Sequence, residues 1–321
     1  MKPIFTHTLN ERVYTAVHPL AQELCFETAK PLVFDLSYLS ILDVEGNTAS
    51  SYLQGQLSCH LDEVTSEQMR PGAQCNLQGR IMSLLDVVDW QGLHLVLPGD
   101  LCAATQASLS KSALFSRVSL KENNDIHVLG VYLPKEMALQ DIGFPVPTTQ
   151  WGVVQDQQYC CYAISDTLKM ILCRPEQKQS LVARFSVEQQ RGSLAWHALE
   201  LEVPRFSIYP NTRGLFLPHR LGLQHTAYIS FNKGCYKGQE IIARTHYRAK
   251  LKHTVKSFIL STQDTIYAGQ KIYADLQQAE IGEVIDYCPL GSQSYRVLLS
   301  ILMEHPCEIY FEKGINPVIL T

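Results

Sequence analysis

The chain has 321 residues, which is too long for one ordinary hydrophobic core, so we expect two or three domains. Its 46% hydrophobic and 18% charged residues are typical of a globular protein and exclude an intrinsically disordered one. No apolar run reaches bilayer length, and residues 1–20 lack the continuous apolar stretch of a signal peptide. We therefore expect a cytoplasmic protein without a membrane segment.

The first 253 residues predict a mixed α/β organisation. An amphipathic helix begins near Ala49, and a second covers Leu101–Leu114. The prolines of residues 144–147 mark a connection rather than a helix. Apolar runs of strand length occur at Leu32–Asp35, Leu84–Asp89, Leu93–Leu97, Ile126–Leu133, Cys160–Ser165 and Lys169–Cys173.

The pattern changes after His253. Short β-type runs separated by Gly, Pro, Ser or Asn follow one another, which predicts a small antiparallel barrel or sandwich. We therefore divide the chain into residues 1–143, 144–253 and 254–321.

The ten cysteines are dispersed along the chain. They contain no C-x-x-C pair and no metal-ligand spacing, so the sequence predicts no metal site. The adjacent Cys160 and Cys161 would point to opposite faces of a strand. We expect free thiols in a reducing compartment rather than disulfides.

Residues 229–253 reverse the sign of the overall charge. The chain carries a net charge of -4, yet this segment holds one acid, Glu240, against six cations. Gly234 and Gly238 flank Cys235 and predict a shaped loop, with a helix beginning near Gly238. A thiol ahead of a helix N-terminus and among lysines ionises readily, so Cys235 is a candidate thiolate or ligand. A buried structural cysteine, and a solvated or nucleic-acid-binding cationic face, are the alternatives.

The same segment carries a family resemblance. Residues 233–240 read KGCYKGQE and are followed by Ala-Arg and Tyr-Arg pairs, which resembles the signature of the YgfZ family. Residues 48–64 and 110–120 resemble further parts of that family. The family is similar in fold to the T-protein of glycine cleavage, a tetrahydrofolate-dependent aminomethyltransferase. The resemblance implies two interleaved α/β domains and a C-terminal antiparallel β-barrel around a central folate-binding opening.

The resemblance also implies site residues. Cys235 and Lys233 correspond to the reactive part of the signature. Glu202 lies where T-proteins carry the acid of a leucine-glutamate-alanine-glycine run, so similarity proposes it as the group that binds the pterin; the alternative is a surface carboxylate. The implied cofactor is tetrahydrofolate or a related reduced folate, and the other candidate contacts are Tyr236, Gln239, Arg244 and Arg248.

The chain departs from the transferases in ways that matter for catalysis. Ser83 and Leu84 stand where the transferases have paired aspartates, and the nearest acid, Asp86, would require a register shift. Pro204 and Arg205 replace a glycine and an apolar residue. Because aminomethyl transfer needs a general acid or base near the reacting folate nitrogen, we do not expect an active glycine-cleavage enzyme.

Three function classes follow. The first is a folate-binding accessory protein that supports iron–sulfur enzymes, such as a tRNA methylthiotransferase, and thereby tRNA modification. The second is a folate-dependent one-carbon transferase, which requires an acid against the folate. The third is a protein that binds tRNA directly through its basic run, for which affinity would fall steeply with salt. We expect a monomer whose partners are folate and iron–sulfur client enzymes.

Overall fold

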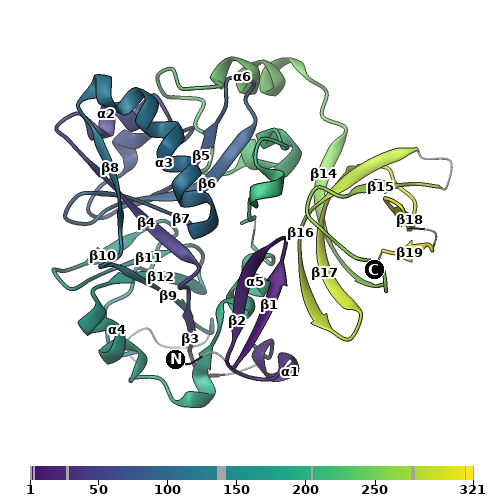
Figure 1. Cartoon of the computed structure of the whole chain (residues 1–321), viewed down its shortest axis with the longest axis horizontal. Helices are drawn as coiled ribbons and strands as arrows, with labels where there is room; N and C mark the ends of the chain where they lie inside the picture. Colours follow the sequence, from purple (N-terminus) through teal and green to yellow (C-terminus); the bar gives the residue numbers. More distant parts are fainter. Residues whose placement is uncertain are drawn as a thin grey trace.

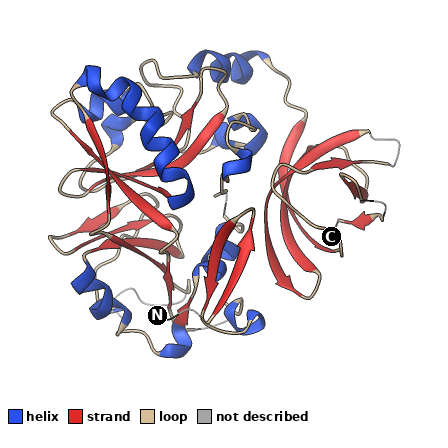
Figure 2. Ribbon diagram, viewed as in Figure 1, coloured by secondary structure: helices blue, strands red, loops and turns tan. Residues whose placement is uncertain are grey.

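The computed structural model describes residues 2, 4–26, 29–135, 142–203, 205–275, 279–314 and 316–320. These residues form three larger β-sheets, a two-stranded hairpin and short helices (Figure 1, Figure 2). Pro204 lies outside the described residues. The mixed α/β content and the sheet at the C-terminal end confirm the predicted fold class at this level. The domain boundaries at 143 and 253 stay predictions.

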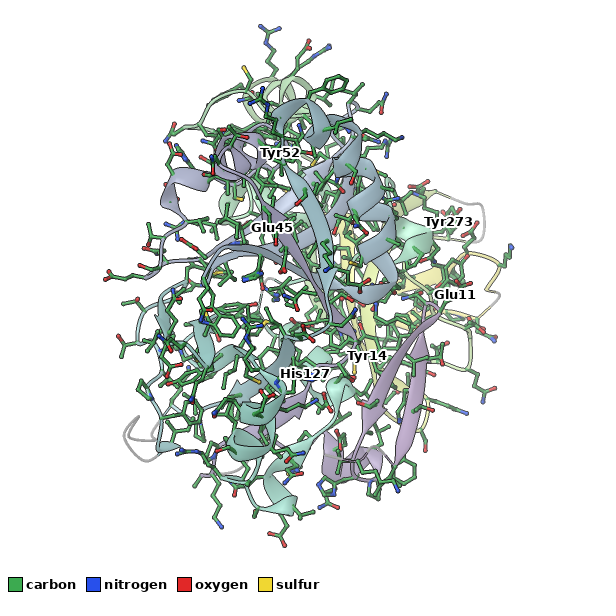
Figure 3. All side chains as sticks on the ribbon, turned by 60° about the vertical axis from the view of Figure 1, so that its left-hand side comes forward. Glu11, Tyr14, Glu45, Tyr52, His127 and Tyr273 are labelled. Carbon is green, nitrogen blue, oxygen red and sulfur yellow. The ribbon has the colours of Figure 1, made fainter. Side chains whose placement is uncertain are left out.

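The first large sheet has the strand order β5-β6-β7-β4-β8. Helix α3 (Gly99–Ala113) packs against this sheet, and helix α2 (Ala49–Gln54) lies next to α3. The Tyr52 hydroxyl on α2 donates to Leu109 O on α3 at 2.5 Å (Figure 3). Two 3-10 helices, η1 (Leu61–Glu63) and η2 (Leu114–Ser116), belong to the same part of the chain. The strands are β4 (Leu39–Glu45), β5 (Arg70–Cys75), β6 (Ile81–Asp89), β7 (Leu93–Pro98) and β8 (Ser119–Asn123).

The second sheet has the order β10-β11-β12-β9-β3-β13 and is buried on both faces. Cys160 and Cys161 pack into two different hydrophobic cores, as their alternation along β11 predicts. A Cβ on Gly130 of β9 would lie 2.5 Å from the Trp196 ring, so only glycine lets this ring pack on the sheet. The strands are β3 (Leu32–Asp35), β9 (His127–Tyr132), β10 (Val153–Gln155), β11 (Tyr159–Ala163), β12 (Leu168–Cys173) and β13 (Gln190–Arg191), and the helices are α4 (Pro175–Val182) and α5 (Ser193–Glu200).

The third sheet has the order β14-β17-β16-β15-β18-β19, with antiparallel pairing throughout. Its last strand approaches its first, so the sheet nearly closes into the predicted barrel (Figure 1). The strands are β14 (His253–Ser261), β15 (Lys271–Tyr273), β16 (Glu280–Gly291), β17 (Ser294–Leu302), β18 (Glu308–Phe311) and β19 (Val318–Ile319).

A hairpin near the N-terminus was not predicted. It pairs β1 (Phe5–Leu9) with β2 (Arg12–Ala16) through Asn10 and Glu11, both of which have positive φ angles. Two such residues form the tight turn that matches the twist of a hairpin. The short helix α1 (Leu20–Glu23) follows. The buried Glu23 carboxylate accepts hydrogen bonds from the backbone N–H groups of Val17 and His18.

Buried polar side chains join this hairpin to α5 and to the third sheet. Tyr14, in the middle of β2, stacks on His197 of α5 with ring centroids 4.7 Å apart (Figure 3). His197 Nε2 lies 3.3 Å from Asp286 Oδ1 on β16, and the Tyr209 hydroxyl donates to the same oxygen at 2.7 Å. All four side chains belong to fully buried residues. The network therefore holds three separate parts of the chain together.

This network predicts a pH-dependent stability. Burial by itself would lower the pKa of His197, but the Asp286 carboxylate outweighs burial and raises that pKa above its ordinary value. The unfolded-state value is about 6.5. The stabilisation from the protonated ring is therefore fully present below that pH and is lost as pH rises through the folded-state pKa. We expect urea unfolding across this window to show a fall of at most about 1.4 kcal/mol per pH unit.

The matched control is His197→Gln, whose amide N–H can still donate to Asp286 but does not titrate. The fall in unfolding free energy should be smaller in this variant than in the unchanged protein. Equal slopes in the two proteins would show that His197 does not titrate in the folded state at these pH values.

Candidate functional site

The signature loop, residues 233–238, is packed against the turn between β5 and β6. Gly238 has a φ of 85°, and a Cβ there would lie 2.4 Å from Asn76 O and 3.0 Å from Gly79 Cα. The second glycine of the signature is thus required both for backbone conformation and for close approach. The Lys237 N–H donates to Gly55 O at 3.1 Å, which ties the loop to the end of α2. Helix α6 (Gln239–Arg248) begins directly afterwards, as predicted.

Cys235 is exposed at this loop. Each of the ten cysteines is a free thiol, and Cys25, Cys235 and Cys307 are the exposed ones. An open groove of about 590 Å³ runs beside Cys235 between the loop, α3 and the β5–β6 turn. Lys111 and Lys237 are among its lining residues. The thiol is therefore accessible to a reaction partner and lies beside positive charge.

Lys233 turns away from solvent. Its Nζ donates to Leu57 O at 2.7 Å and to Cys59 O at 2.6 Å, and it lies 5.1 Å from the centroid of the Tyr236 ring. Burial lowers the pKa of Lys233 to about 8. The amine fastens the loop to the segment that follows α2. Tyr236 is buried below it, and no described residue bonds its hydroxyl.

Helix α6 presents cations to solvent. Arg244 and Arg248 are exposed, and Tyr247 between them is 71% exposed. The Gln239 side chain stays local, since its Oε1 accepts from the Tyr236 N–H at 3.3 Å. Ile242 is the residue of α6 that is fully buried. The arginines therefore belong to a surface rather than to a closed pocket.

Glu202 lies elsewhere. It follows α5, its side chain is 45% exposed, and its Oε1 lies 2.8 Å from Arg296 Nη1 on β17. Helix α5 lies near the hairpin and α6 at the top of the molecule, so the two ends of the predicted folate site are well separated (Figure 1). The structure thus places Glu202 in one region and Tyr236, Gln239, Arg244 and Arg248 in another.

A cavity of about 280 Å³ lies beside the residues that follow Glu202. Its wall includes Trp151, Val203, Arg205 and Tyr228. Trp151 has a φ of 66°, a left-handed conformation that costs a residue with a side chain about 1–3 kcal/mol and is held here by backbone hydrogen bonds on both sides. Such strain concentrates at binding sites, and this cavity is the second candidate site.

The cavity wall is backed by a buried charge network. Arg205 donates from Nη1 and Nη2 to the two oxygens of Asp86 at 3.0 and 2.7 Å, and from Nε to Glu200 Oε1 at 2.8 Å. The Tyr162 hydroxyl also donates to Asp86 Oδ2, at 2.9 Å. Asp86 is fully buried, and the Arg205 side chain is 13% exposed. Coulombic attraction to Asp86 outweighs the effect of burial and raises the pKa of Arg205.

This network bears on the transferase alternative. Asp86 is the acid nearest to the missing aspartates, but its two oxygens are taken up by a guanidinium fork and a phenol. The Asp86 carboxylate is therefore buried and engaged inside the protein rather than set against a ligand. Ser83 is buried and its hydroxyl turns to the neighbouring backbone. Within the described residues, no group of three or more His, Cys, Asp or Glu could hold a metal ion.

Sequence reasoning missed the cavity residues that matter most. Arg205 appears in the sequence only as a departure from the transferase pattern, and Trp151 and Tyr228 carry no motif. One signal was available in the sequence, because the chain departs from the transferases at both positions. It has a carboxylate at Asp86 and a cation at Arg205, and these two residues, 119 positions apart, pair with each other.

Comparison with known proteins bears on identity. No protein-family model matches the chain. It is 26% identical over 234 residues to the tRNA-modifying protein YgfZ of Colwellia psychrerythraea, with 72% of each chain covered. It is 28% identical over 241 residues to the protein of that name from Yersinia enterocolitica, with 73% of each covered.

The solved structures show the fold. The chain is similar to the glycine cleavage system aminomethyltransferase T from Bartonella henselae, with a TM-score of 0.69 and 16% identity, over 99% of this chain and 92% of that one. No described helix has both the length and the apolar character needed to cross a membrane. The recognition made from the signature is therefore confirmed: the chain has a T-protein-like fold and resembles the YgfZ proteins over more than two thirds of its length.

Proposed function

We propose that this protein is a folate-binding accessory protein that supports iron–sulfur enzymes and through them tRNA modification, with Cys235 as its reactive group. The observation that carries the proposal is the exposed thiol in the signature loop, beside a groove with lysines at its edge. The relatives named tRNA-modifying proteins support the link to tRNA. The clients would be iron–sulfur enzymes such as a tRNA methylthiotransferase, and we propose a monomer in the cytoplasm.

A single cysteine does not hold an iron–sulfur cluster by itself. Clusters are held by several thiolates, and no described group near Cys235 supplies them. Cys235 would therefore act as one thiolate toward sulfur, iron or a cluster whose other ligands belong to the client. Lys233 would contribute by holding the loop in place through its two carbonyl contacts.

The cavity next to Val203 fits the ring end of a folate. Its volume is about 280 Å³, and Trp151 and Tyr228 supply aromatic surface for a flat heterocycle. Glu202, adjacent in the chain, would accept hydrogen bonds from the pterin. Its present ion pair with Arg296 is partly exposed, and such pairs contribute about 0–1 kcal/mol, so it is easily exchanged. A folate bound there would supply a one-carbon or redox carrier.

Trp151 offers a direct test of this binding. Trp90 and Trp196 are buried, at 1% and 0% exposure, so a change in tryptophan emission upon ligand addition should come mainly from Trp151. We expect saturable quenching by a reduced folate that varies little between low and high salt. Glu202→Gln should weaken binding about tenfold or more without changing stability, because a hydrogen-bonded charge contributes about 1.5–3 kcal/mol.

Two controls complete the titration. Trp151→Phe should remove the fluorescence change while calorimetry still detects binding. Gln239→Ala tests the other candidate region. If Gln239→Ala weakens binding and Glu202→Gln does not, the folate binds beside the signature loop. If the protein binds folate saturably and neither change alters the affinity, both assignments are wrong.

A second candidate function is direct tRNA binding. Arg244, Arg248 and Lys250 are exposed on and after α6, and the exposed Tyr247 offers a ring on which a base could stack. Such binding predicts that affinity falls steeply as salt rises, because phosphate contacts release counterions. A gel-shift titration with tRNA at two salt concentrations tests it. Arg248→Gln should then weaken binding and reduce the salt slope.

A further inference from the structure

Arg205 has one hydrogen-bond donor left for a ligand. Of its five N–H groups, one on Nε is taken by Glu200 and one on each Nη by Asp86. Nη2 also lies 3.8 Å from Met170 Sδ. Among the described residues, nothing takes the second N–H of Nη1. The same side chain lines the 280 Å³ cavity beside Val203 and is 13% exposed.

The guanidinium is also fixed in place. Two carboxylates bind three of its N–H groups at 2.7–3.0 Å, and Asp86 is itself held by Tyr162. A planar fork bound in this way cannot rotate to follow a ligand. The cavity therefore presents a preorganised hydrogen-bond donor beside Trp151 and Tyr228. The apolar residue that Arg205 replaces in the transferase pattern would offer no donor.

We propose that Arg205 determines which pterin the cavity accepts, by donating a hydrogen bond to the 4-oxo group. This inference rests on the proposed folate binding. One edge of a pterin presents the 2-amino group, N3–H and the 4-oxo oxygen in sequence: two donors and then an acceptor. A carboxylate satisfies the two donors, and a guanidinium N–H satisfies the acceptor. Glu202 and Arg205, three residues apart, supply these two kinds of group.

A carboxylate alone already distinguishes the two kinds of pteridine. N3 of a 4-oxo pterin carries a hydrogen that Glu202 can accept, whereas N3 of a 2,4-diaminopteridine carries none, so Glu202 alone favours the 4-oxo compound and Arg205 strengthens that preference. A 4-amino group opposite the Arg205 N–H places two donors against each other and leaves both unpaired. Sites built to hydrogen-bond a given group reject analogues that lack it.

The test uses folic acid and aminopterin, which differ at position 4 of the pteridine. Calorimetric titration of the full chain should give about ten- to hundredfold weaker binding of aminopterin. Equal or tighter binding of aminopterin, with normal binding of folic acid and of a reduced folate, would overturn the role of Arg205 and leave folate binding intact. Absence of binding by all three compounds would overturn the proposed function together with this inference.

Two variants separate recognition from folding. Arg205→Met alone leaves two buried carboxylates unpaired, so a folded yield low enough to prevent titration is a realistic result. A second variant therefore exchanges the network together, Arg205→Met with Asp86→Leu and Glu200→Gln, and its folding is checked by circular dichroism. Its preference for folic acid over aminopterin should be about tenfold smaller than that of the unchanged protein, because only the share due to Arg205 is lost. If the folded triple variant keeps the full preference of the unchanged protein for folic acid, Arg205 is not the group that binds the 4-oxo oxygen.

Discussion

Replacing Cys235 by serine is expected to abolish support of iron–sulfur enzymes while leaving the fold intact. The thiol is exposed, so its removal creates no cavity, and the melting temperature should not change measurably. Serine keeps the size of the side chain but is a far weaker nucleophile and ligand than a thiolate. The measurement is the methylthiolated fraction of adenosine in tRNA from cells that carry the variant as their only copy.

The chain provides its own controls for this experiment. Cys25 and Cys307 are the other exposed thiols, and neither lies beside the groove. Cys25→Ser and Cys307→Ser should both retain full support. A Cys235→Ser protein that supports normal methylthiolation would remove the thiol from the mechanism, and loss of support in all three variants would point to a general effect on abundance.

Replacing Arg205 by methionine should lower the free energy of unfolding more than any other single substitution proposed for this protein. The change leaves Asp86, which is fully buried, and Glu200, which is 7% exposed, without their cation. Removing one partner of a buried ion pair costs about 3–5 kcal/mol because an uncompensated charge stays in a poorly solvated environment. Urea unfolding followed by circular dichroism measures this loss directly.

Arg70→Met is the matched control. Arg70 pairs with Glu63 at 2.6 Å, but the Glu63 side chain is 51% exposed. Solvent screens such a pair, so its loss should cost about 0–1 kcal/mol. Similar losses in the two variants would mean that the Arg205 network is better solvated than its burial indicates. Exchange of Asp86 and Glu200 together with Arg205 should recover most of the stability, since removing all the charges leaves none unpaired.

The sequence by itself predicted the elements that depend on local pattern. The strand at residues 32–35 and the helix that begins after Gly238 were predicted with their bounds nearly correct. The near-closed sheet of the last quarter was also predicted, since its short runs and turn residues are visible locally. The resemblance came mainly from the contiguous signature around Cys235, with residues 48–64 and 110–120 in support, and contiguous segments of this kind can be found without a structure.

The tertiary structure decided the contacts between distant parts of the chain. Spacing alone does not show that Arg205 meets Asp86, or that Glu202 meets Arg296. It also does not show that the Lys233 amine binds two backbone carbonyls instead of facing the thiol. The physical reason is that a charged side chain pairs with whichever opposite charge the packed core brings within about 3–4 Å, whereas helix and strand patterns depend on neighbours within a few residues. The sequence therefore determined the signature loop and the fold class, and packing decided which side chains meet at the cavity.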